Sequence, residues 1–230
     1  MKIKNLSARQ ILDSKGDPTL QVKVELDDGT MATAGVPAGA STGKFEALDL
    51  RDSQGVSKAI NNVNIKIAAA LEGKPADDQA AIDKIMIGLD ATANKSKLGA
   101  NAIVGVSLAV CRVAAKARKI GLYEHIGELS GNHQFVMPQP MILLMEGGRH
   151  GNWATDIQEL LIIPKKEKFP GFKAGFEAGR EVFYALELVL KEKGYAVNLG
   201  LEGGYCPKLK SDKEALELMS QAVKRTGFVL

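Results

Sequence analysis

Two groups of polar side chains in the second half of the chain have the residue types and spacing for acid–base chemistry. The first lies in MEGGRHGNWATDIQELLIIP, which begins at Met145, and its members are Glu146, His150, Asp156, Gln158 and Glu159. The second is Glu202, within GLEGGYCP. Two carboxylates in one pocket push each other's pKa apart, and one of them can then hold a proton. These residues therefore predict a pocket that joins Glu159 and Glu202.

Two strands must place the first group. Residues 141–145 and 160–163 are short apolar runs bounded by turn residues, which is typical of strands. If they pair antiparallel, the end of the first and the start of the second lie at one edge. That edge then carries Glu146, His150, Gln158 and Glu159. Taken alone, this stretch is equally compatible with an ordinary polar loop whose acids are solvated.

The rest of the second half predicts a helix, a strand and a helix. These elements are expected over residues 172–193, 195–199 and 211–227. The last begins at an S-x-x-E capping box at Ser211. This order is part of a β/α barrel, whose sites lie at the carboxyl ends of the parallel strands. Glu202 follows such an end, on the face that carries Glu159; the alternative is that Glu202 only caps a turn.

The first half predicts a small antiparallel sheet followed by helices. Strands are expected over residues 3–12, 20–26 and 31–36, because the second alternates apolar and polar side chains and a DDG turn leads to the third. Helices are expected over residues 56–71, from 77 or 78 to 89, and 100–120. The fold class is thus an α+β domain at residues 1–131, followed by an incomplete β/α barrel at residues 138–230.

Composition narrows the class of protein. The net charge of +3, from 30 basic and 27 acidic residues among 230, is too small to indicate a nucleic-acid or membrane partner. Two cysteines fit a reducing compartment, and no apolar run approaches the roughly 18 residues that span a bilayer. The first ten residues lack the apolar core of a secretory signal. A cytoplasmic location is expected.

Several stretches of the chain resemble the amino-terminal part of enolases, the phosphopyruvate hydratases. They are ARQILDSKGDPTLQVKVEL, VPAGASTG, FEALDLRD, NKSKLGANAIVGVSLAV, GGRH, IQE and LEGGYCP, in that order. The resemblance implies a lyase of glycolysis that reversibly removes water from 2-phosphoglycerate to give phosphoenolpyruvate. In such enzymes a lysine removes a proton, Mg²⁺ stabilises the enolate, and a glutamate protonates the leaving hydroxyl.

The resemblance also implies roles for individual residues. Glu202 matches the proton-donating glutamate, and Glu159 matches its partner carboxylate. Positions that match substrate contacts are His150, Gln158, Ala40 and Ser41. Ser41 further matches the loop serine that binds the second Mg²⁺ when its loop closes, a movement that excludes water from the site.

The chain departs from the family pattern near these positions. Four residues differ from those that the family usually has: Lys15 replaces an arginine, Glu146 an asparagine, Arg149 a serine and Leu201 an aspartate. The segment after Arg51-Asp52 is also shorter than in the family. Losing the aspartate removes a charge beside Glu202 and alters the tuning of that acid. Arg149 adds a cation that can help to bind phosphate or pair with Glu146.

In the family, the acidic ligands of the first Mg²⁺ and the lysine base lie beyond the position that matches Leu230. The resemblance therefore implies that the chain is inactive alone and acts with a complementary carboxyl-terminal half, as part of a split enzyme or as a fragment of a longer one. The open alternative is a non-catalytic enolase-like protein that binds a phosphorylated acid or a partner.

An incomplete barrel leaves strand edges uncovered. The apolar face of the long helix is expected to be uncovered too, including Phe176, Phe183, Leu186 and Leu190. Exposed edges and apolar patches favour association. A homodimer, a complex with a complementary half, or aggregation is therefore expected for the whole chain.

Overall fold

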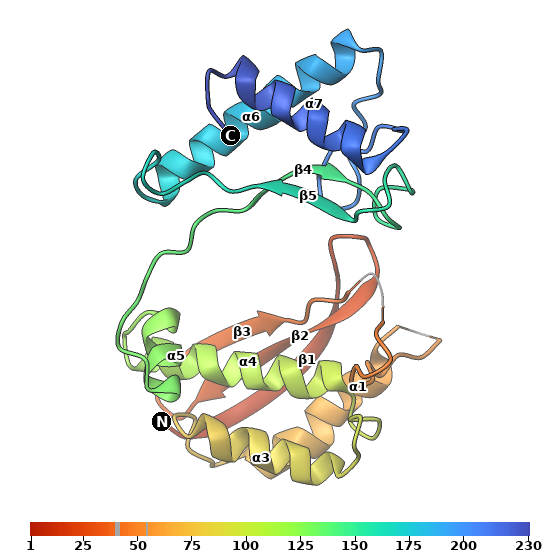
Figure 1. Ribbon diagram of the computed structural model, residues 1–230. Coiled ribbons are helices and arrows are strands. Elements are labelled where there is room, and N and C mark those ends of the chain that lie inside the picture. The colour runs from red at the N-terminus through yellow and green to blue at the C-terminus, as the bar shows by residue number, and fades with distance from the viewer. Residues whose placement is uncertain (40–41, 54) are drawn as a thin grey trace. The chain divides into compact units, whose positions relative to one another are not determined.

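The computed structural model describes residues 1–39, 42–53 and 55–230 (Figure 1). The chain divides into two compact units, Met1–Phe135 and Val136–Leu230. Each unit has its own cluster of buried apolar side chains and therefore a core of its own.

The first unit is built on a three-stranded antiparallel sheet in the order β1-β2-β3. Its strands are β1 (Ile3–Leu12), β2 (Pro18–Leu26) and β3 (Met31–Gly35). Every second residue of β2, from Leu20 to Leu26, is fully buried, while Lys23 between them is exposed. The alternating pattern therefore does place one face of the sheet in the core and the other in solvent, as predicted.

The helices of the first unit pack on the buried face of this sheet or on one another. They are α1 (Ser57–Asn61), the π-helix η1 (Asn62–Ile67), α2 (Ala68–Leu71), α3 (Gln79–Asp90), α4 (Ala100–Ala117) and α5 (Leu122–Ser130). The side chain of Asp78 accepts the amide of Ala81 and caps α3, as the sequence indicates. Figure 1 shows α4 lying along β2 and β3. In length and composition α4 alone among the described helices resembles a membrane span, but buried core helices pass the same test.

The predicted helix over residues 56–71 contains a π-helical stretch, which its spacing did not indicate. The π turn presents two amide side chains to different neighbours. Asn62 donates to the carbonyls of Lys97 and Leu98 at 3.2 and 3.0 Å. Asn64 accepts the amide of Ala8 at 2.6 Å and donates to the carbonyl of Ala8 at 3.3 Å. The side chain of Asn64 thus occupies the hydrogen-bonding position that a neighbouring strand would take beside β1.

Helix α5 was not predicted. Gly121 looked like the end of the preceding helix, yet it also begins α5, since its amide donates to Glu124 Oε2 at 2.6 Å. Gly131 ends the helix with a φ of 70°. Two helices that share a glycine boundary are hard to separate by apolar spacing alone.

His125 on α5 should make the stability of the first unit depend on pH. It is buried, and burial together with the nearby Arg118 guanidinium holds the pKa of His125 below its usual value, while Glu128 and Asp77 act in the opposite direction. Below about pH 6.5 the unfolded chain therefore binds a proton that the folded unit resists, so the free energy of unfolding falls as the pH falls.

The measurement is urea unfolding of the parental chain and of His125→Gln between pH 5 and 8, where this slope is expected to be smaller in the variant. His133→Gln, which changes an exposed histidine, is the matched control. Equal slopes for the parental chain and His125→Gln would contradict this assignment.

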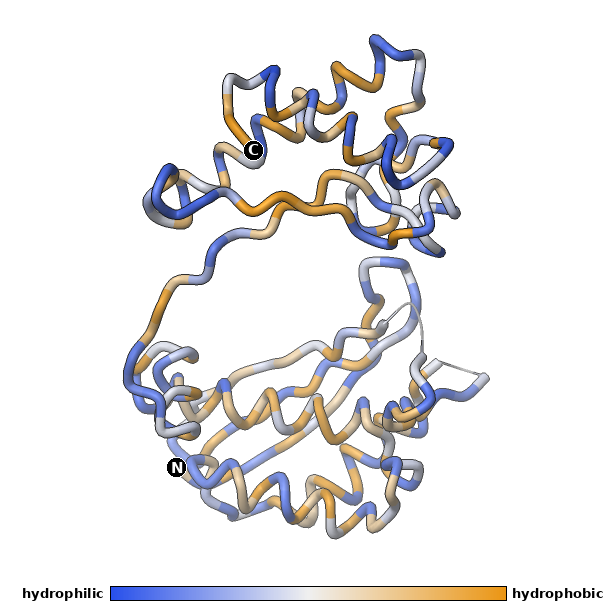
Figure 2. The backbone as a smooth tube through the Cα atoms, in the orientation of Figure 1, coloured by the Kyte–Doolittle hydropathy of each residue, from blue (hydrophilic) through white to orange (hydrophobic). Residues whose placement is uncertain are grey.

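The second unit pairs β4 (Ile142–Glu146) with β5 (Glu159–Ile162) in an antiparallel arrangement, as predicted. Figure 2 shows β5 as a hydrophobic stretch of the chain. Helix α6 (Phe172–Glu192) packs on β4 and on α7 (Asp212–Arg225). Ser211 caps α7 by accepting the amide of Glu214, as predicted. The reciprocal half of the predicted capping box is not formed, because the Glu214 carboxylate accepts the amide of Lys210 and the hydroxyl of Tyr195.

Two expectations for this unit were wrong. Residues 195–199 form no strand, because Tyr205 takes the place beside β4: Glu146 N donates to Tyr205 O and Tyr205 N to Leu144 O, both at 2.9 Å. The apolar face of α6 is also largely covered, because α7 and β4 pack against it. Leu186 and Leu190 are fully buried, and Phe183 stacks on the ring of Tyr205.

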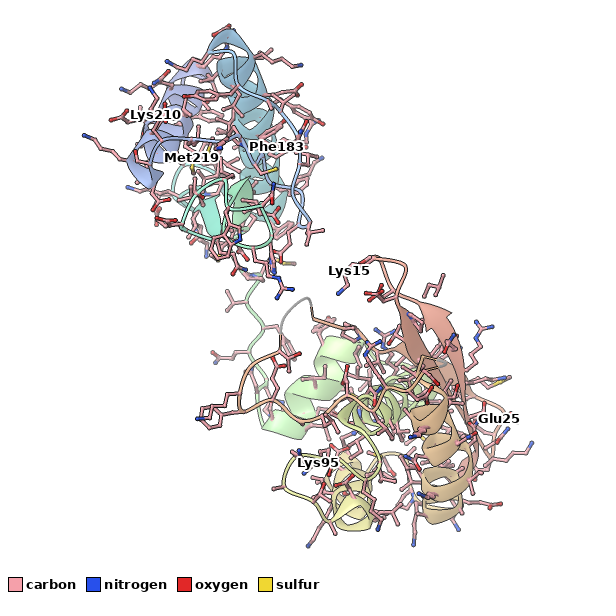
Figure 3. The ribbon with its side chains drawn as sticks, turned by 90° about the vertical axis from the view of Figure 1, so that its right-hand side faces the viewer. Lys15, Glu25, Lys95, Phe183, Lys210 and Met219 are labelled. Carbon is pink, nitrogen blue, oxygen red and sulfur yellow. The ribbon has the colours of Figure 1, made fainter. Side chains whose placement is uncertain are left out.

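The packing between α6 and α7 is visible in Figure 3, which labels Phe183 and the buried Met219. Phe176, near the start of α6, is the member of the predicted stripe that stays exposed, at 49%. The second unit therefore has a closed core of its own, and its uncovered surface lies elsewhere.

Candidate functional site

Two loops of the second unit meet where β4 ends. One connects β4 to β5, and the other spans residues 200–204 just before Tyr205. The hydrogen bonds between Tyr205 and β4 hold the second loop beside the first. Residues about fifty positions apart in the sequence are thereby brought together, by Tyr205 and not by the strand predicted over residues 195–199.

His150 and Glu202 form the closest contact between the two loops. His150 Nδ1 lies 2.8 Å from Glu202 Oε1 and 3.3 Å from Gln158 Nε2. The His150 side chain is 12% exposed and the Glu202 side chain 43% exposed, so the imidazole is shielded while the carboxyl reaches solvent. Three of the predicted site residues thus form one connected group.

This group can hold a proton at a defined place. Nδ1 of His150 cannot donate to Glu202 and accept from Gln158 in the same tautomer. A protonated Nδ1 donates to the carboxylate of Glu202. A bare Nδ1 instead accepts from Gln158 and from a protonated Glu202. Only the second arrangement places the proton on Glu202, which is what a general acid needs.

Glu159 does not join this group. It is exposed at the start of β5, with Glu146 as its Cα partner across the strand pair. Within the part of the chain that the structure describes, no hydrogen bond or ion pair joins Glu159 to Glu202. The partner of Glu202 in the structure is His150, and the sharing of one pocket by Glu159 and Glu202 stays a prediction.

Glu146 lies deeper than the sequence indicated. It was expected at the polar edge, but it is only 1% exposed. Its carboxylate accepts the backbone amides of Glu202 and Gly204. Arg149 is exposed and, among the described residues, makes no ion pair with Glu146. The only sign of this buried contact in the sequence was that Glu146, an acid, stands where the family has the amide asparagine.

The loop positions Ala40 and Ser41 lie outside the described residues. Lys15, labelled in Figure 3, binds the segment just before them. Its ammonium donates to the carbonyls of Ala38 and Gly39 at 3.3 and 3.2 Å and lies 3.9 Å from Asp13. Lys15, which stands where the family has arginine, therefore holds the chain at residues 38 and 39.

The residues present do not fit a metal site by themselves. In residues 1–39, 42–53 and 55–230, no group of three or more histidine, cysteine, aspartate or glutamate side chains is placed to hold a metal ion. Hard cations such as Mg²⁺ need several oxygen ligands at about 2.1 Å. The exposed Glu159 and the histidine-paired Glu202 do not form such a set.

Comparison with known families covers nearly the whole chain. The family model of the enolase N-terminal domain matches residues 3–126, and that of the enolase C-terminal TIM barrel domain matches residues 134–230. The first match corresponds to the sheet and helices of the first unit, and the second to the strand pair and helices of the second. Enolases are lyases that generally depend on Mg²⁺. This chain belongs to the enolase family.

Proposed function

We propose that the chain takes part in the reversible dehydration of 2-phosphoglycerate to phosphoenolpyruvate, with Glu202 protonating the leaving hydroxyl. The observation that carries this proposal is the 2.8 Å contact between His150 Nδ1 and Glu202 Oε1. It gives Glu202 a proton-sharing partner while 43% of its side chain remains accessible. A carboxyl that is both partnered and reachable suits a general acid.

The other predicted residues take supporting roles in this proposal. His150 and Gln158 orient polar groups of the substrate, and Glu159 contributes negative charge at the start of β5. Ala40 and Ser41 contact the substrate from their loop, and Ser41 would hold a metal ion there.

In this proposal the base and the principal metal ligands are not among the described residues of this chain. We propose that a complementary carboxyl-terminal half, in the same or another polypeptide, supplies them. The support for this is the missing cluster of metal-holding side chains in the described residues. The same observation favours a second candidate function: an enolase-like protein without catalysis that binds a phosphorylated acid.

The first test is binding. Addition of 2-phosphoglycerate to the ¹⁵N-labelled chain is expected to shift the amide signals of Gln158 and Glu202 and the ring signals of His150. Inorganic phosphate at the same concentration is the control for unspecific anion binding. Signals that move only elsewhere in the chain would contradict both candidate functions.

The second test separates the two candidates. The purified chain with Mg²⁺ is expected to show no measurable dehydration, because the described residues contain no metal-holding set. Adding the carboxyl-terminal half of an enolase should restore turnover if the chain is part of an enzyme. Binding without turnover in the mixture would favour the non-catalytic candidate. Turnover by the chain alone, in a preparation free of host enolase, would overturn the proposal that a second half supplies the base and the metal ligands.

A further inference from the structure

The carboxylate of Glu146 is a buried acid whose partners are backbone amides. Glu146 is the last residue of β4 and is 1% exposed. Among the described residues, no lysine, arginine or histidine lies within ion-pair distance of it. A buried charge without a cation is costly unless hydrogen bonds compensate for it, so the partners of this carboxylate decide its role.

The hydrogen bonds come from the loop that carries Glu202. The amide of Glu202 itself lies 3.1 Å from Oε1 and 3.0 Å from Oε2 of Glu146. The amide of Gly204 lies 3.3 Å from Oε2. Both oxygens of the Glu146 side chain therefore accept amides of this loop.

The loop is shaped around this carboxylate. A Cβ on Gly200 would lie 2.5 Å from the carboxylate carbon of Glu146, so a side chain at that position would displace it. Backbone bonds close the base of the loop, from Gly200 N to Gly204 O at 2.9 Å and from Cys206 N to Asn198 O at 3.0 Å. These bonds hold the base of the loop. Glu146 instead accepts the amides of Glu202 and Gly204, the two tip amides of the loop.

We infer that Glu146 is the positioning residue of Glu202: it binds the Glu202 amide so that the Glu202 carboxyl meets His150. The acid role of Glu202 rests on the proposed function, but the hold on the loop does not. Asparagine, which the family pattern has at this position, is one methylene shorter and offers a single acceptor oxygen. The hold of a buried glutamate on the Glu202 loop therefore distinguishes this chain from the family pattern.

Amide hydrogen exchange tests the inference on the whole chain. Glu146→Ala is expected to raise the exchange rates of the Glu202 and Gly204 amides by about tenfold or more, because their acceptor is gone. The amides of Tyr205 and Cys206, whose acceptors are backbone carbonyls, serve as internal references. Glu146→Gln keeps one acceptor oxygen and is expected to restore part of the protection. Glu181→Ala, at an exposed position of α6, is the matched control.

A second measurement follows the contact between His150 and Glu202. The ring ¹⁵N signals of His150 in Glu146→Ala are expected to move toward those of Glu202→Ala, because both changes remove the carboxyl from Nδ1. A purely structural role for Glu146 would leave these ring signals unchanged.

Each outcome decides the inference. Unchanged protection of Glu202 and Gly204 in Glu146→Ala would overturn it, and so would an equal loss of protection throughout α6 and β4. If Glu146→Ala does not fold, Glu146→Gln decides: faster exchange confined to the two tip amides supports the inference, and unchanged exchange overturns it. If the tip amides respond while 2-phosphoglycerate shifts no signal, the proposed function fails and the positioning role stands.

Discussion

Glu202→Gln is expected to lower turnover of the complemented complex by about a hundred- to ten-thousand-fold, the range that a general acid contributes. Glutamine keeps the length and shape of the side chain and can still contact His150 Nδ1. It has no proton to donate to the leaving hydroxyl. Since the 43% exposed carboxyl is replaced by an amide of similar size, the affinity for 2-phosphoglycerate should change little.

The measurement pairs steady-state turnover with a binding titration on the same complex. Glu181→Gln is the control, because Glu181 is exposed on α6 and remote in sequence from both site loops. Near-parental turnover in Glu202→Gln would show that another group donates the proton. A large loss of affinity would instead assign Glu202 to substrate binding.

The 230-residue chain is expected to associate at roughly tens of micromolar, whereas residues 1–135 alone should remain monomeric. The cause lies in the second unit, where β5 is one edge of a two-stranded sheet and, among the described residues, no further strand pairs with it. Beside β5 runs an apolar groove of about 320 Å³ that also touches α6, α7 and residues 228–230. An open strand edge next to an apolar groove favours pairing with another chain.

Sedimentation of both chains across a concentration series tests this expectation. Replacing Ile163 and Val229, which line the groove and are 52% and 94% exposed, with lysine should reduce the association. Exposed lysine opposes pairing at strand edges. A 230-residue chain that sediments as a compact monomer at every concentration would mean that the groove and edge are not a contact surface.

The elements that the sequence predicted well are those whose signal is local. The alternation in β2, the Asp78 cap of α3 and the Ser211 cap of α7 each depend on a few neighbouring residues, and the structure confirms all three. The antiparallel pairing of β4 and β5 was also predicted, because both strands are short apolar runs that follow each other along the chain.

The features that sequence reasoning missed depend on contacts between distant segments. Residues 195–199 have strand-like composition, but Tyr205 takes the place beside β4. The contact of His150 with Glu202 joins residues about fifty positions apart, and neither residue's neighbours indicate it. The burial of Glu146 depends on a loop more than fifty residues later. No local pattern contains that information.

The contact between Asn64 and β1 bears on how the chain is made. The outer edge of β1 is occupied at Ala8 by the Asn64 amide, and at Ile3 by backbone bonds to Gly73 and Lys74. All of these partners lie within the first 74 residues of the chain. A ribosome therefore releases the groups that seal this edge long before it completes the second unit. The early part of the nascent chain can thus cover the edge of β1 with its own groups while the later part is still being synthesised.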